Sequence, residues 1–316
     1  MTWTAVLAAL LGHVVFSFVD PAITESSGLV DLGSTMVTTN DSGGAPLVFV
    51  VDATTGRTVG RTTFTDRTVD VEALAPAGGD VVWVGDIGDN AEVRSSVQVY
   101  RVPVGRGDRR VAAPAYELVY PDGPHDAESL VVAPGGRLYV ITKALLGGTV
   151  YAAPRHLSTS GPNRLHAVAG VDVWATDAAL FPDGRHVLVR GYDNAVVYTF
   201  PGFRPVAAVD LPRQRQGEGV SIGRTGRIRL SSEGRNSPVL EVALPAEVTA
   251  AMAGTSPSAV TASPTPAATP PTRRDPGSGD GNGWLLVLAA TTGGAAVLLL
   301  AALLAGSRRS RRQPAR

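Results

Sequence analysis

The chain contains no cysteine among its 316 residues. This absence excludes a disulfide framework, a thiol nucleophile and any thiolate metal site. Lysine is almost absent as well, because Lys143 is the only one, and we attribute this to the codon bias of a GC-rich genome. Charged residues make up only 18% of the chain and hydrophobic residues 44%, which argues against a wholly disordered chain.

Basic and acidic side chains balance at 28 each, but five of the arginines lie in the last eleven residues, 306–316. Without that tail, 23 basic residues stand against 28 acidic ones, a net charge of −5. Nucleic-acid binding needs clustered lysine and arginine. Nucleic acid is therefore not expected as a partner.

The C-terminal part predicts a membrane anchor. Residues 284–305 form an uncharged apolar run, which is long enough for one transmembrane helix. The basic tail 306–316 follows directly, and short basic flanks stay in the cytoplasm. Residues 251–283 are rich in Pro, Ser, Thr and Gly, which predicts a disordered linker. We expect a single-pass protein of the cell membrane, with its N-terminal domain extracellular.

The N-terminal residues 1–13 form an apolar segment that resembles part of a secretory signal peptide, although no Lys or Arg precedes it. The extracellular side of the anchor still requires export, so we interpret the segment as signal-like. The ectodomain is then expected over 14–250.

A repeat runs through the ectodomain. Each unit has an acidic residue, small and apolar residues, a Gly-containing turn and further β-rich runs. The acids are separated by 47, 56, 49 and 41 residues. They are Glu25, Glu72, Glu128, Asp177 and Glu218. This period and four short strands per unit are typical of β-propeller blades.

The fifth unit lacks its outer strand, because the chain passes from VLEVALP into the linker. The N-terminal run VVFSFVDPAIT is a candidate for that strand, which would close the ring and remove an exposed sheet edge. Signal cleavage near Gly12 would be compatible with this closure. No stretch between Glu25 and Pro245 has sustained helical periodicity. The sequence therefore predicts an all-β, five-bladed propeller, with six blades as the alternative.

The runs ITESSGLV, TTNDSG, VGDIGDN, YPDGPHDAESL and ITK resemble exported bacterial β-propeller proteins of the WD-repeat-like and phytase-like superfamily. The resemblance covers roughly residues 20–245. It implies a surface-exposed propeller, here membrane-anchored, and no particular catalytic signature.

Propeller topology predicts where polar side chains gather. The start of the first strand and the end of the second strand of each blade lie on one face. We therefore expect an acidic channel mouth that binds a ligand. The candidate residues are Glu25, Asp41, Glu72, Asp86, Asp89, Asn90, Asp126, Glu128, Lys143, Asp177, Arg190 and Glu218. The aromatic residues, Trp174 and Tyr192 among them, are expected to pack between blades.

Converging carboxylates must be neutralised, by a bound cation, by basic partners or by raised pKa values. Ca²⁺ takes oxygen ligands, and an exported protein meets it. Its candidate ligands are Glu72, Asp86, Glu128, Asp177 and Glu218. Alternatively, Lys143 and Arg190 pair with neighbouring acids. In GDIGDN (85–90), the polar side chains either bind Ca²⁺ or cap a tight turn.

Two functions follow. The first is a non-catalytic, cell-surface propeller that binds an extracellular ligand or protein partner at its acidic mouth. The alternative is a Ca²⁺-dependent phosphoesterase of phytase-like type, in which His125, Lys143 and Arg190 would handle phosphate and protons. A purely structural, wall-associated module is a third possibility.

Overall fold

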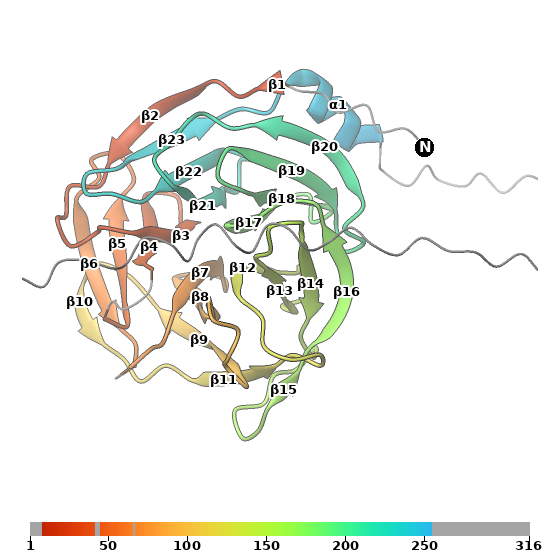
Figure 1. Ribbon diagram of the computed structural model, residues 1–316. Coiled ribbons are helices and arrows are strands. Elements are labelled where there is room, and N and C mark those ends of the chain that lie inside the picture. Colours follow the sequence, from red (N-terminus) through yellow and green to blue (C-terminus); the bar gives the residue numbers. More distant parts are fainter. Residues whose placement is uncertain (1–7, 42–44, 66, 255–316) are drawn as a thin grey trace, which may run out of the picture. The chain divides into compact units, whose positions relative to one another are not determined.

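The computed structural model describes residues 8–41, 45–65 and 67–254. In this part of the chain, β-strands form five sheets that are arranged as a ring, with the first strand of each sheet innermost (Figure 1). The prediction of an all-β, five-bladed propeller is confirmed. Of the linker expected at 251–283 and the transmembrane helix expected at 284–305, all residues from 255 on lie outside the described residues.

Blades 1 and 2 are four-stranded antiparallel sheets, each with one additional parallel strand at its outer edge. Blade 1 consists of β3 (Ser26–Asp31), β4 (Thr35–Asn40), β5 (Leu47–Asp52), β6 (Thr58–Thr63) and β10 (Gly107–Arg110). Blade 2 consists of β7 (Val71–Pro76), β8 (Val81–Asp86), β9 (Val97–Pro103), β11 (Ala115–Val119) and β15 (Asn163–Arg164).

Blades 3 and 4 repeat the same order of strands. Blade 3 consists of β12 (Ala127–Val132), β13 (Leu138–Thr142), β14 (Gly148–Ala152) and β16 (His166–Val171). Blade 4 consists of β17 (Asp177–Leu180), β18 (His186–Arg190), β19 (Asn194–Thr199), β20 (Pro205–Asp210) and the short parallel strand β1 (Ala8–Ala9).

Blade 5 joins the two ends of the propeller. Its first three strands are β21 (Gly217–Ile222), β22 (Ile228–Ser232) and β23 (Pro238–Val242). The outer strand is β2 (Gly12–Ser17), which pairs antiparallel with β23 (Figure 1). The predicted closure by the N-terminal run is confirmed, and β2 begins two residues before the domain boundary expected at 14.

The core lies between blades rather than at the ring's centre. Five clusters of buried apolar residues each join two neighbouring blades. At the junction of blades 5 and 1, Phe16 and Phe18 pack with Phe49 and Val239. Burial of such side chains is the main stabilising contribution in a ring of separate sheets.

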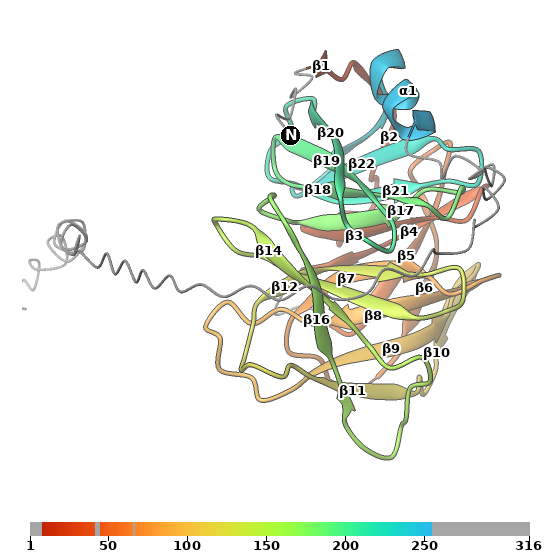
Figure 2. The ribbon, with the colours of Figure 1, turned by 90° about the vertical axis from the view of Figure 1, so that its right-hand side faces the viewer.

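One helix, α1 (Ala246–Gly254), follows the last strand and contacts β20 (Figures 1 and 2). Its Val248 is buried in the cluster between blades 4 and 5. The helix extends four residues past 250, where the sequence suggested that the linker begins. None of the helices among the described residues is long and apolar enough to cross a membrane.

Candidate functional site

A polar cavity of about 390 Å³ opens where the five blades bring their innermost strands and adjoining loops together. Each blade contributes to it. Its charged and polar lining residues are Asp41, Glu72, Asn90, Asp126, Glu128, Lys143, Tyr192, Gln216 and Glu218, joined by Trp174, Ala144 and Leu145. Seven of the twelve candidate residues named from the sequence therefore meet in one cavity, which we call the mouth.

β-Bulges direct three of these acids into the mouth. The strand register shifts around Glu72 in β7, Glu128 in β12 and Glu218 in β21, so that extra residues interrupt the pairing with the second strand. A bulge re-aims the side chain of its extra residue. All three acids are buried, with at most 5% of their surface exposed.

Blade 1 differs from the predicted pattern of one acid per blade. Its bulge falls between Ser26 and Leu29, so Ser27 takes the place that Glu72 holds in blade 2. The hydroxyl of Ser27 donates to the Glu72 main-chain oxygen at 2.6 Å and to its Oε2 at 3.1 Å. The repeat pattern aligned Glu25 with the other acids, but Glu25 is exposed. Its main chain forms an isolated antiparallel β-bridge with Glu233.

Asp177 and Arg190 lie beneath the mouth and do not line it. Both are fully buried and pair across β17 and β18. The carboxylate of Asp177 accepts hydrogen bonds from Ala178 N at 2.8 Å and Val220 N at 2.7 Å. The Arg190 guanidinium donates to the carbonyls of Gly219 and Ser231. These two residues connect blade 4 to blade 5 through hydrogen bonds.

The segment GDIGDN positions other groups. Asp86 accepts from the main-chain N–H of Val69 and Asp70 and forms a 3.0 Å ion pair with Arg94. Asp89 accepts from Arg94 N at 2.7 Å. Only Asn90 reaches the mouth. Asp89 therefore caps the loop after β8, whereas Asp86 holds the segment that precedes β7.

Lys143 pairs with Glu128, which is one of the ways in which the converging carboxylates were expected to be neutralised. Its ammonium donates to Oε1 of Glu128 and lies 5.8 Å from the ring centroid of Trp174 and 5.2 Å from that of Tyr192. Burial raises the pKa of Glu128, and the ammonium opposes that rise. The carboxylate in turn raises the pKa of Lys143. The mouth thus already holds one cation between a carboxylate and two aromatic rings.

The surroundings of two other mouth acids, Glu218 and Glu72, raise their pKa values. Burial, and then the negative charge of Glu128, raises the pKa of Glu218 to about 9. Burial and the charges of Glu128 and Asp41 likewise raise the pKa of Glu72 far above its usual range. The mouth is therefore a place where added positive charge is favourable.

Glu218→Gln is expected to remove part of the pH dependence of stability. A folded-state pKa of about 9 exceeds the unfolded value near 4.3, so the contribution of Glu218 falls as pH rises between them. Relative to the unchanged chain, the free energy of unfolding of the variant should increase by up to about 4 kcal/mol from pH 5 to pH 8. Urea unfolding at both pH values measures this. Glu25→Gln is the control, and an equal offset at both pH values would contradict the expectation.

The phosphate-handling residues of the enzyme alternative do not gather. His125 Nε2 lies 3.0 Å from Asp122 Oδ1 and 2.9 Å from the Tyr151 hydroxyl, outside the mouth. Arg190 is committed to main-chain carbonyls. Of the three residues, Lys143 alone lines the cavity.

Sequence reasoning missed three contributors. Trp174 and Tyr192 were expected in the core, yet both line the mouth, and Trp174 is 44% exposed. Each stands beside a strand end, at the positions where propeller topology places mouth residues. The third is Asp70, which directly precedes β7 and contributes a carboxylate close to Asp41 and Glu72. Its position two residues before Glu72 is the feature of the sequence that could have identified Asp70 as a site residue.

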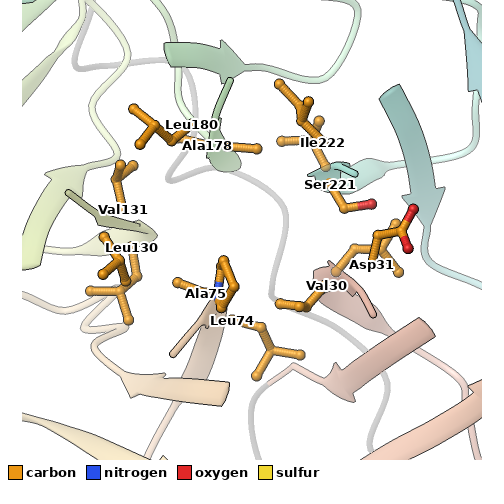
Figure 3. Close-up of a pocket in the computed structure, with 15 residues that line it drawn as sticks. Val30, Asp31, Leu74, Ala75, Leu130, Val131, Ala178, Leu180, Ser221 and Ile222 are labelled. Atoms are coloured by element: carbon orange, nitrogen blue, oxygen red, sulfur yellow. The ribbon is translucent and has the colours of Figure 1, made fainter. Parts of the chain in front are cut away.

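Below the mouth the channel is mostly apolar. The inner strands surround a narrow cavity of about 150 Å³, where Val30, Leu74, Leu130, Ala178 and Ile222 face a common space (Figure 3). An apolar channel disfavours the passage of charged groups. A charged ligand would therefore be retained at the mouth.

Comparison with known proteins shows no matching family and no matching curated protein. Among solved structures, the PQQ-bound aldose sugar dehydrogenase of Streptomyces coelicolor is 12% identical over 74% of this chain and 97% of its own, with a TM-score of 0.47. A catalytically inactive variant of virginiamycin B lyase from Staphylococcus aureus, with quinupristin, is 10% identical over 75% and 74%, with a TM-score of 0.40. At these scores neither likeness supports an inference about function.

Proposed function

We propose that the chain is a non-catalytic, membrane-anchored propeller at the cell surface, which binds a protein partner by inserting a basic side chain of that partner into the mouth. The observation that carries the proposal is the convergence of acids from four blades on one cavity of about 390 Å³. That volume is in the range of ligand pockets. Among the described residues that line it, Lys143 is the only basic one.

The rim of the mouth supports a protein partner. Leu145 lines the mouth and is 73% exposed, and its chain neighbour Leu146 is 96% exposed. With Trp174, which also lines the mouth, Leu145 places apolar surface beside an acidic centre. A basic residue flanked by apolar residues complements both, and aromatic residues are frequent anchors of such interfaces.

The surface location rests on the sequence. The apolar run 284–305, the basic tail 306–316 and the part of the linker 251–283 that follows residue 254 lie beyond the described residues. Their composition suits a tethered extracellular module. The phosphoesterase alternative gains no comparable support, because only Lys143 of its three proposed residues lines the mouth.

A labelled peptide with three arginines among leucine and serine residues tests the proposal. At pH 8, we expect it to bind the full chain in mild detergent, and a peptide with glutamate in place of arginine not to bind. Glu218→Gln should weaken binding about tenfold, and higher salt should weaken it further. Fluorescence anisotropy measures both, with Glu25→Gln as the control. Equal affinity for the two peptides, or no binding of either, would refute the proposal.

A further inference from the structure

A group of three carboxylates lies at the edge of the mouth between blades 1 and 2. Asp41 follows β4, Asp70 precedes β7, and Glu72 lies in the bulge of β7. One oxygen from each residue lies within 4.8 Å of the others. Asp70 and Glu72 are buried, whereas Asp41 is half-buried and lines the mouth. Like charges at this separation repel strongly unless they are neutralised.

Asp70 supplies an independent indication of a ligand. Its side chain is 8% exposed, and its buried Oδ1 has no hydrogen-bond partner among the described residues. The nearby guanidinium of Arg94 is directed to Asp86, at 3.0 Å, and to the main-chain oxygen of Gly88, at 2.7 Å. A buried carboxylate oxygen without a partner is costly, because desolvation is not repaid by a hydrogen bond.

The backbone leaves room for these carboxylates. A β-carbon at position 88 would lie 2.5 Å from Oδ2 of Asp70 and 2.8 Å from Cγ of Glu72. Glycine at this position therefore allows the loop after β8 to pass directly over both acids.

We propose that Asp41, Asp70 and Glu72 bind one Ca²⁺ ion, which faces the mouth. The ligands are all carboxylate oxygens, and such hard donors select Ca²⁺ or Mg²⁺ over softer metals. Calcium–oxygen distances of about 2.3–2.6 Å place opposite ligands about 5 Å apart, close to the separation found here. Water from the open side of the mouth completes the coordination.

This site differs from the calcium ligands that the sequence suggested, because of those five residues it retains only Glu72. It also goes beyond the proposed partner binding, since either one can fail while the other holds. With Ca²⁺ in place, Asp126 and Glu218 remain to attract a basic side chain.

The test is a thermal unfolding series on the full chain in mild detergent, first with a chelator and then with Ca²⁺ or Mg²⁺ alone. At about 100 times its Kd, Ca²⁺ should raise the Tm by about 5 °C, and Mg²⁺ should raise it less. Calorimetric titration should give one Ca²⁺ per chain. No shift together with no heat would overturn the proposal, and a larger response to Mg²⁺ would overturn the assignment to Ca²⁺.

Variants locate the site. Asp70→Asn should abolish the Ca²⁺-induced shift, and Glu72→Gln provides the same test should the first variant not fold. Asp193→Asn changes an exposed aspartate in the loop after β18 and is the matched control, which should keep the full shift. A full Ca²⁺ response in both Asp70→Asn and Glu72→Gln would refute this placement.

Discussion

Replacement of Arg190 by methionine is expected to lower the free energy of unfolding by about 4 kcal/mol. The side chain is fully buried, and burial lowers its pKa to about 10, which still leaves it charged at neutral pH. Its guanidinium donates to Gly219 and Ser231 main-chain oxygens in blade 5 and to Oε1 of Gln214. Methionine keeps the apolar stem but leaves these acceptors unpaired beside the buried Asp177.

Arg190→Lys is the matched control, because it keeps the charge but loses the planar fork of donors. It should be destabilised less than the methionine variant. Gly217 shows how closely the guanidinium is enclosed, since a β-carbon there would lie 2.2 Å from Nη2 of Arg190. Urea unfolding followed by tryptophan fluorescence measures both variants. A loss below about 1 kcal/mol for methionine would show that these bonds do not join blades 4 and 5.

Gly56→Ala is expected to destabilise the closure of the ring. Gly56 lies in the turn between β5 and β6 and has φ +71°. Its main-chain oxygen accepts a hydrogen bond from Val19 N at 3.0 Å. A β-carbon at this position would lie 1.9 Å from the main-chain oxygen of Ser17, the last residue of β2. The substitution therefore strains the contact between blade 1 and the outer strand of blade 5.

Gly226→Ala separates this clash from the cost of the backbone conformation. Gly226 has φ +81°, and a β-carbon there would meet no atom within 4 Å. We expect it to cost about 1 kcal/mol, the penalty of a left-handed residue. Gly56→Ala should cost about 3 kcal/mol more because the backbone must also move. Equal losses in the two variants would mean that β2 can shift freely and does not lock the ring.

The fold was predictable because its signals are local and repeated. Alternating strands, Gly turns and evenly spaced acids specify blades, and the missing outer strand of blade 5 pointed to the N-terminal run that forms β2. The four short strands expected in each unit are present in blades 1 to 4, where β6, β11, β16 and β20 are the fourth strands. Such patterns arise because alternate residues of a strand are buried on one face of the sheet, and this alternation is visible in the sequence.

The site was only partly predictable, because a shift of one residue in a strand turns a side chain to the other face. The repeat aligned Glu25 with Glu72, but the bulge in β3 places Ser27 there. No pattern distinguished Asp177, which is sealed beneath the mouth, from Glu218, which lines it. The difference lies in the bulge that β21 has and β17 lacks.

The central claim is that acids far apart in the sequence act together as one cation-binding mouth. The most direct test is the affinity of the arginine peptide for the triple variant Glu72→Gln, Glu128→Gln, Glu218→Gln, measured with a chelator present and after thermal unfolding has shown that the variant is folded. We expect binding to fall at least a hundredfold, because the acids of blades 2, 3 and 5 are removed from one cavity. Unchanged affinity in the folded triple variant would contradict the claim.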